Sequence, residues 1–218
     1  TPAKGEVINI YRETYKCPTC STASQMAENI KFVKAHVPEA LIPNSYTSES
    51  AVAWVMYQKF VNATPLYRQE QDWKQLGVPF TRATLANWII YCAKTYFEPM
   101  YEYLHRQLLA RTYLMADETR IQVLKEPERN PETDSFMWLF RTGEDGLPPI
   151  ILYHYTETRA KYNAASFLKG FSGYLETDGY QGYNNLPGVK RCSCWAHMRR
   201  YFIEAVPKGK EYDYSNPA

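Results

Sequence analysis

The chain has 218 residues, of which 45% are hydrophobic and 22% are charged, and its formal net charge at pH 7 is +2. This length fits a catalytic domain plus a smaller module, and the composition excludes a chain that is disordered throughout. No apolar run approaches the roughly 18 residues of a membrane span, and no basic segment followed by an apolar core opens the chain. We therefore expect a cytoplasmic protein with no membrane partner, whose small net charge neither requires nor excludes a nucleic acid.

The cysteines number five, and four of them form two closely spaced pairs, Cys17 with Cys20 and Cys192 with Cys194. This spacing is typical of metal binding or packing rather than of a secreted disulfide framework, so we expect a reducing compartment. The chain begins at Thr1 without a methionine, and no closing element follows its last helical pattern. We expect both ends to be cuts.

The first predicted element is a strand over residues 7–16, where β-branched and aromatic residues alternate. It runs into Cys17 and Cys20, a pair that resembles the second knuckle of a zinc ribbon. The first cysteine pair of such a ribbon is missing, and a lone His36 is a poor replacement. We expect half of a zinc ribbon over residues 1–36, with zinc bound in the intact protein and weak or absent zinc binding here.

A polar, proline-bearing linker is predicted over residues 37–47, and a helical module over residues 48–110. Three helices are expected: one starting after an N-cap at Ser48 or Ser50, one over residues 66–76 that Gly77 ends, and one that starts at Thr81 and runs beyond Ile89 unless Pro99 kinks or splits it.

The second and third of these helices have the proportions of a helix-turn-helix, whose second helix enters the major groove of DNA. Candidate DNA contacts at the start of the third helix are Thr81, Arg82, Thr84 and Asn87. Arginine and asparagine suit guanine and adenine edges, and threonine hydroxyls reach phosphates. The alternative is a plain helical hairpin that packs on the rest of the protein. In either case the expected core residues of the module are Tyr67, Trp73, Trp88 and Tyr91.

In the remainder of the chain, residues 111–218, the order of predicted strands and helices is typical of a mixed α/β sheet. Strands are predicted over residues 112–115, 135–141, 149–155, 173–177 and 190–195, with a short helix over residues 164–169 before the fourth strand.

Two aspartates each follow an apolar strand pattern, Asp117 after residues 113–116 and Asp178 after residues 173–177. If the two strands are neighbours, both carboxylates lie side by side at one end of the sheet, where hard oxygen ligands suit magnesium or manganese. Phosphoryl transfer from DNA uses such a site, because two ions activate the attacking oxygen and stabilise the leaving oxygen. The alternative is that both are turn residues, since Asp178 with Gly179 is a common turn pair.

The phrases around these aspartates closely resemble, in order, the transposases of the insertion sequence 66 family, and the resemblance covers roughly residues 7–204. The phrases are Ala116-Asp117-Glu118-Thr119, Phe136-Met137-Trp138, Phe167-Leu168-Lys169-Gly170-Phe171, Thr177-Asp178-Gly179-Tyr180-Gln181-Gly182-Tyr183-Asn184 and Cys194-Trp195-Ala196-His197-Met198-Arg199-Arg200. Upstream, Pro65-Leu66-Tyr67-Arg68-Gln69-Glu70 and Leu85-Ala86-Asn87-Trp88 are also similar.

The resemblance implies a ribonuclease-H-like core in which Asp117 and Asp178 are the first two acidic residues of an Asp-Asp-Glu triad that binds Mg²⁺ or Mn²⁺. The third residue, a glutamate, is expected on a helix well beyond the tryptophan-histidine phrase, after this chain ends. Glu204, Glu211 and Asp213 are poor substitutes. The chain alone is therefore expected to be inactive.

His197, Arg199 and Arg200 are candidates for holding a DNA phosphate near the metals, because arginine forks match phosphate oxygens. The alternative for His197 is a buried, hydrogen-bonded histidine in a strand-to-helix turn. Cys192 and Cys194 point the same way from a strand, which could allow a metal with His197, although packing in the core is the expected role.

The sequence as a whole favours a transposase fragment of α/β fold, with a ribonuclease-H-like mixed sheet preceded by a helix-turn-helix-like module and half of a zinc ribbon. Its partner would be DNA, both mobile-element ends and target, and synapsis of two ends implies a homo-oligomer associated with the bacterial nucleoid. The alternative function is a DNA-binding regulator without catalysis, derived from a decayed mobile element.

Overall fold

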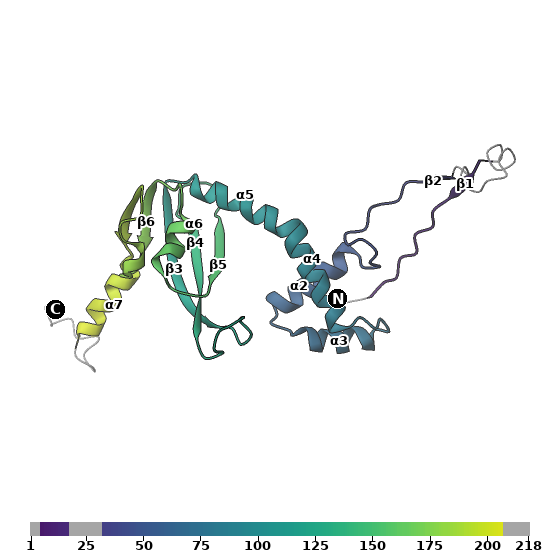
Figure 1. Cartoon of the computed structure of the whole chain (residues 1–218), viewed down its shortest axis with the longest axis horizontal. Helices are drawn as coiled ribbons and strands as arrows, with labels where there is room; N and C mark the ends of the chain where they lie inside the picture. Colours follow the sequence, from purple (N-terminus) through teal and green to yellow (C-terminus); the bar gives the residue numbers. More distant parts are fainter. Residues whose placement is uncertain (1–4, 18–31, 207–218) are drawn as a thin grey trace. The chain divides into compact units, whose positions relative to one another are not determined.

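A computed structural model of the chain describes residues 5–17 and 32–206 (Figure 1). The chain divides into two compact units, and the boundary between them falls between Phe97 and Glu98. Each unit has its own hydrophobic core, one made by helices and the other by a mixed sheet with helices on it. Among the described residues, no helix is both long and apolar enough to cross a bilayer.

The first unit begins with a two-stranded antiparallel ribbon of β1 (Thr14–Lys16) and β2 (Phe32–Lys34). The strand predicted over residues 7–16 forms only in its last three residues, because a strand needs a partner for its backbone hydrogen bonds and β2 offers three residues. All six strand residues are exposed, so neither β1 nor β2 is held by a core. Cys17 follows β1 and is half-buried, whereas Cys20 lies outside the described residues.

The helices of the first unit lie where the sequence predicts them. They are α2 (Glu49–Phe60), α3 (Leu66–Gln75) and α4 (Arg82–Cys92). Ser48 caps α2, since its hydroxyl accepts the backbone N–H of Ala51 at 3.3 Å, and Pro65 directly precedes α3. After α3 the chain turns at Gly77, whose φ of +81° is a conformation that favours glycine.

Their apolar faces meet in a core formed by Ile42, Val52, Val55, Leu85, Trp88 and Cys92. Phe80 joins it with two edge-to-face ring contacts, at 5.4 Å to Trp73 and 4.7 Å to Trp88. Trp88 is buried, and Trp73 and Tyr91 pack against this core as predicted. The prediction for Tyr67 is wrong: its side chain is 58% exposed, because the inner face of α3 is formed by Leu66, Gln69 and Trp73 instead.

A π-helical segment, η2 (Ala93–Phe97), ends the first unit, and α5 (Glu98–Leu109) begins the second. The change of helix type comes directly before Pro99, which has no N–H and whose ring would meet the carbonyl four residues earlier in a regular α-helix. The predicted helix therefore continues past Pro99, with a widened turn in place of a break. Helix α5, which the sequence prediction grouped with the helical module, packs on the sheet through Leu108.

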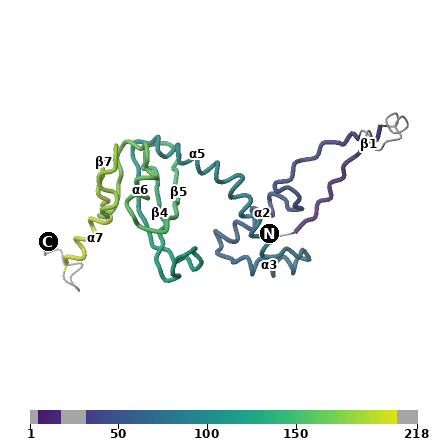
Figure 2. The backbone as a smooth tube through the Cα atoms, in the orientation of Figure 1, coloured from purple at the N-terminus to yellow at the C-terminus, as the bar shows by residue number. Residues whose placement is uncertain are grey.

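The second unit is a five-stranded sheet with the order β5-β4-β3-β6-β7 (Figure 2). Its strands are β3 (Tyr113–Gln122), β4 (Asp134–Thr142), β5 (Ile151–Thr156), β6 (Gly173–Thr177) and β7 (Val189–Ser193). The first three form an antiparallel meander, while β6 pairs parallel with β3 and β7 parallel with β6. This mixed α/β arrangement is compatible with the predicted ribonuclease-H-like core.

One face of the sheet carries the core, because every second residue of each strand points to it. The buried strand residues on this face are Leu114, Ala116, Trp138, Phe140, Leu152 and Leu175. Helix α6 (Lys161–Phe167) covers them, and its Phe167 ring stacks on Phe140 with 4.0 Å between centroids. From α5, the His105 ring packs on Phe167 and its Nε2 lies 2.8 Å from the Phe167 carbonyl oxygen.

Candidate active site

Of the two candidate aspartates, Asp117 lies in β3 and Asp178 directly follows the neighbouring strand β6. The two strands are parallel with Met115 opposite Glu176, and each aspartate comes two residues later in the chain. The prediction that Asp117 ends its strand is wrong: β3 continues to Gln122, because the antiparallel β4 keeps supplying backbone partners there. Asp178 does follow the last residue of β6.

The two carboxylates have different surroundings. Asp117 is exposed, and strand alternation points it away from the core face; its Oδ1 accepts only the neighbouring Glu118 N–H, at 2.9 Å. Asp178 is half-buried and lies beyond β6, so strand alternation does not fix its direction. Its Oδ1 accepts the Tyr180 N–H at 2.9 Å, which is the turn that the sequence also allows, and its Oδ2 lies 3.8 Å from the Arg159 guanidinium.

A third carboxylate, which the sequence analysis did not single out, is the most buried acidic group here. The Glu118 side chain is 1% exposed, because its place on β3 has the same parity as the buried Leu114 and Ala116. Arg159 donates to its Oε1 from Nε, at 2.7 Å, and also from a terminal nitrogen. The Tyr183 hydroxyl donates to its other oxygen at 2.5 Å. Strand alternation in the sequence could have indicated this role, because it assigns Glu118 to the same face as the apolar residues Leu114 and Ala116. An acidic residue on a buried face requires a buried partner.

Arg159 and Tyr183 come from segments far from β3 in the sequence. Arg159 precedes α6, and its guanidinium lies 3.8 Å from the centre of the Tyr180 ring, whose hydroxyl in turn donates to the Arg159 carbonyl oxygen. Tyr183 belongs to the 3₁₀ turn η3 (Gln181–Tyr183). Burial, followed by the hydrogen bond to Glu118, holds the pKa of Tyr183 well above its ordinary value, and the charges of Glu118, Asp178 and Asp117 add to this shift.

The backbone at Asp178 is held from the side of β7. Arg191 donates from Nε to the Thr177 hydroxyl at 2.8 Å, and from its terminal nitrogens to the Asp178 carbonyl oxygen and to Asn184. The Cys194 N–H donates to the Thr177 carbonyl oxygen at 2.9 Å. The main chain at Asp178 is thus fixed from one side, and Arg159 approaches its side chain.

Two of the three carboxylates, Asp117 and Asp178, have the chemistry that suits a hard divalent cation. Asp117 and Asp178 offer carboxylate oxygens, which Mg²⁺ and Mn²⁺ prefer, and Asp178 Oδ2 accepts no hydrogen bond from its neighbours in the described part of the chain. Over residues 5–17 and 32–206, however, no group of three acidic, histidine or cysteine side chains is gathered as a metal site. Glu118 is engaged by Arg159 and Tyr183. Asp117 and Asp178 therefore offer carboxylate oxygens of suitable chemistry, and a metal ion shared between them remains a prediction.

The predicted phosphate-binding residues lie on α7 (Trp195–Ala205), directly after β7. Arg199 and Arg200 are exposed, and the Nδ1 atom of His197 is buried without a hydrogen-bond partner in the described structure. The helix passes close to the turn after Asp178, because a Cβ added at Gly179 would lie 3.2 Å from the Tyr201 hydroxyl. Glu204, also on α7, is exposed.

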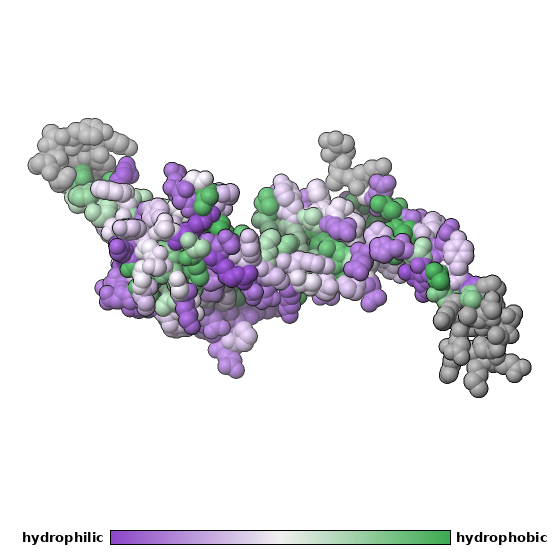
Figure 3. Space-filling view, turned by 90° about the horizontal axis from the view of Figure 1, so that it is seen from above, coloured by the Kyte–Doolittle hydropathy of each residue, from purple (hydrophilic) through white to green (hydrophobic). Residues whose placement is uncertain are grey.

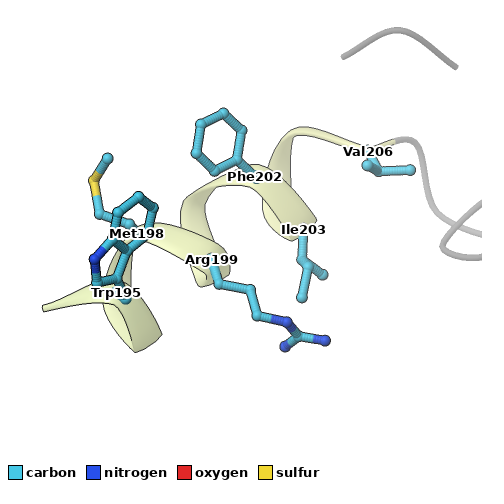
Figure 4. Close-up of a pocket in the computed structure, with 6 residues that line it drawn as sticks. All are labelled: Trp195, Met198, Arg199, Phe202, Ile203 and Val206. Carbon is cyan, nitrogen blue, oxygen red and sulfur yellow. The ribbon is translucent and has the colours of Figure 1, made fainter.

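The outer surface of α7 is apolar beside these arginines. Figure 3 shows green side chains over this helix. A shallow hollow of about 290 Å³ there is lined by Trp195, Met198, Arg199, Phe202, Ile203 and Val206 (Figure 4). Arg199 therefore extends from an apolar surface rather than from a basic patch.

The candidate DNA contacts on α4 stand at its N-terminus. The Thr81 hydroxyl accepts the Thr84 N–H at 3.2 Å and lies 3.0 Å from the Thr84 hydroxyl, so both threonines take part in capping. Glu70 of α3 accepts the backbone N–H of Arg82 at 2.9 Å. The side chains of Thr81, Arg82 and Asn87 are exposed, and that of Thr84 is half-buried. The start of this helix is thus accessible at three of the four predicted positions, and DNA contact remains a prediction.

The cysteine pair near the end of the sheet is separated between two elements. Cys192 lies in β7, Cys194 is the residue before α7, and both are half-buried thiols. Tyr113, on β3, donates its hydroxyl to Glu176. This hydrogen bond, followed by burial and the nearby Glu176 charge, raises the pKa of Tyr113 to about 12, and Cys192 and Cys194 contribute. No metal grouping that includes these thiols forms among the residues that the structure describes.

Comparison with known proteins identifies the family to which this chain is similar. A family model described as the transposase IS66 family matches residues 44–216. Two uncharacterized proteins of Sinorhizobium fredii are similar in sequence: y4qI, 28% identical over 186 residues, and y4jD, 27% identical over 218 residues. The matches cover 79% and 94% of this chain but 34% and 41% of those relatives, so the chain spans between a third and half of their length.

Proposed function

The chain belongs to the IS66 family of transposases, and we propose that it takes part in metal-dependent cleavage of the ends of a mobile DNA element and in joining those ends to target DNA. Asp117 and Asp178 are the proposed metal-binding carboxylates. The observation that supports their role is the parallel pairing of β3 with β6, in which Met115 lies opposite Glu176 and each aspartate of the family phrases follows two residues later.

The proposed metal is Mg²⁺ or Mn²⁺; bound in pairs, such ions activate an attacking oxygen and stabilise a leaving oxygen in phosphoryl transfer. Asp117 supplies an exposed carboxylate and Asp178 a half-buried one whose backbone is fixed by Arg191. Among the described residues, no third acidic side chain is gathered with these two into a metal site. We accordingly expect the 218-residue chain alone to bind metal weakly and to cleave no DNA.

DNA is the proposed partner at two places. Near the candidate active site, the exposed guanidiniums of Arg199 and Arg200 are suited to phosphate oxygens, with His197 in the same helix turn. In the helical unit, Arg82 and Asn87 are exposed near the start of α4 and suit base edges, while Thr81 and Thr84 are the proposed phosphate contacts. A homo-oligomer would bring two element ends together.

Manganese binding tests the metal site in the chain as it stands. Titration of Mn²⁺, followed by electron paramagnetic resonance, should show binding that Asp117→Asn and Asp178→Asn each weaken by at least about 10-fold, because each removes a charged ligand. Asp134→Asn is the matched control, since this exposed carboxylate at the start of β4 pairs with Arg120 and faces no part of the site. Equal Mn²⁺ affinity in all four proteins would exclude the proposed pair.

DNA binding is measured separately on labelled duplexes at two salt concentrations. Replacement of Arg199 and Arg200 by alanine should weaken binding to any sequence and flatten its salt dependence. Replacement of Asn87 should change sequence preference if α4 reads bases. Binding of DNA that is unaffected by Mn²⁺ and by the two aspartate variants would instead favour a regulator without catalysis.

A further inference from the structure

The buried Glu118 and its partner Arg159 have no part in the function proposed above. We propose that Arg159 is a positioning residue for the Asp178 carboxylate, and that Glu118 is the internal anchor that holds Arg159 in place rather than a metal ligand. This inference rests on the proposed metal-binding role of Asp178.

Glu118 is suited to be an anchor because its side chain is buried and hydrogen-bonded. Its side chain is 1% exposed, and each carboxylate oxygen has a donor: Arg159 at Oε1 and Tyr183 at Oε2. A buried carboxylate is stable only when it is paired and hydrogen-bonded, so its charge fixes the position of the guanidinium that balances it. A metal ion that bound either oxygen would compete with the donor already present there.

The Arg159 guanidinium interacts with two carboxylates, those of Glu118 and Asp178. Nε and a terminal nitrogen bind Glu118, and the same terminal nitrogen lies 3.8 Å from Asp178 Oδ2. The Tyr180 ring limits movement of the guanidinium plane, with 3.8 Å between its centre and the guanidinium carbon. Lysine has a single nitrogen and could not keep this planar, two-point arrangement.

Arg159 orients the side chain of Asp178, which lies beyond β6 and whose direction strand alternation does not determine. One of its oxygens is tied to the Tyr180 N–H and the other faces Arg159. Tyr180 is itself linked to Arg159 through ring stacking and through its hydroxyl. Arg159 therefore acts on Asp178 directly, by charge, and indirectly, through the turn at Tyr180. The pair with Glu118 is neutral overall, so this positioning adds little repulsion toward a cation.

The test removes the pair without leaving a buried charge. In the double variant Glu118→Gln with Arg159→Met, both charges disappear together and the volumes are nearly kept, which a folded core usually tolerates. We expect the double variant to bind Mn²⁺ roughly 10-fold more weakly than the parent chain, the usual loss when a residue that orients a metal ligand is removed. Unchanged or tighter Mn²⁺ binding would overturn the inference, because Arg159 would then be structural or a competitor of the metal.

A second measurement needs no metal. The Tyr180 backbone N–H should exchange with solvent several-fold faster in the double variant, because Asp178 Oδ1 no longer holds a fixed position to accept it. The Leu147 N–H, which donates to Asp145 in a comparable turn, is the internal control and should not change. An unchanged Tyr180 exchange rate in a folded double variant would contradict the positioning role, whatever the affinity for Mn²⁺.

Two controls separate this inference from the proposed function. Arg120→Met with Asp134→Asn removes another ion pair of β3 and β4, one that is well exposed, and should leave both readouts unchanged. Asp178→Asn reports on the metal site itself. If Asp178→Asn leaves Mn²⁺ binding intact, the proposed function fails; if it abolishes binding while the double variant binds normally, only the role of Arg159 fails.

Discussion

The start of α4 and the neighbourhood of Asp178 are both candidate contact sites for DNA or its metal, but they are assembled differently. At α4 the polar groups satisfy one another within a few residues, as when Thr81 accepts the Thr84 N–H. Around Asp178, the interacting groups come from β3, the segment before α6, the turn at η3, and β7. Local capping forms wherever its short sequence occurs, whereas the second arrangement exists only when the sheet is complete.

The largest expected effect breaks the long-range arrangement. Arg159→Met alone leaves the Glu118 carboxylate buried with only Tyr183 as a donor, and an unpaired buried charge costs about 3 to 5 kcal/mol. Urea unfolding should therefore show a strong loss of stability, and hydrogen exchange should assign it to β3 and not to α2 or α4. Adding Glu118→Gln should recover most of the loss; if it does not, the buried charge is not the cause.

A core substitution in the helical unit should lower the stability of that unit without affecting the sheet. Leu85 is fully buried beside Val55 and Trp88, and Leu85→Ala should cost about 3 kcal/mol through lost burial and the cavity left behind. Hydrogen exchange should rise in α2 and α4 while the β3 amides stay protected. Exposed Leu76→Ala is the control, with little expected change. Equal exchange throughout both units would show that they unfold together.

Tyr183 should make the stability of the sheet unit depend on pH in the alkaline range. Because its pKa is raised in the folded chain, the stability that the neutral hydroxyl contributes is complete below pH 10, the ordinary tyrosine value, and is lost as pH rises above it. Tyr183→Phe should cost about 2 kcal/mol at pH 7, as expected for a hydrogen bond to a charged group. The variant should also lose less stability than the parent between pH 10 and 11. An identical alkaline decline in both proteins would count against the Tyr183 assignment.

The smallest effect is local. Thr81→Ala removes the cap of α4 and should lower the stability of the helical unit by about 1 kcal/mol, while Thr81→Ser should keep it. Thermal unfolding monitored by circular dichroism measures the difference. Mn²⁺ binding at the other site should be unaffected by either change, and a loss of Mn²⁺ affinity in Thr81→Ala would show coupling that local capping does not provide.

Prediction from the sequence succeeded where short segments set their own structure. The start of α2 at Ser48, the turn at Gly77 and the bounds of β6 are as predicted, since caps, positive φ and strand alternation are local properties. The family was also recognised, because its phrases are continuous in sequence. The errors in the strands concern pairing: residues 7–13 have no strand partner within the described part of the chain, and Asp117 pairs with β4, which carries β3 beyond it.

By itself, the sequence determined the three helices of the first unit, the positions of most strands of the sheet, and which aspartates stand in the family's phrases. Only the tertiary structure decided that Glu118 is buried beneath Asp117, and that Arg159, 41 residues further on, neutralises it and reaches Asp178. The physical reason is that caps and alternation depend on neighbours along the chain. The pairing of a buried charge depends on which distant donor the folded sheet brings within hydrogen-bonding distance.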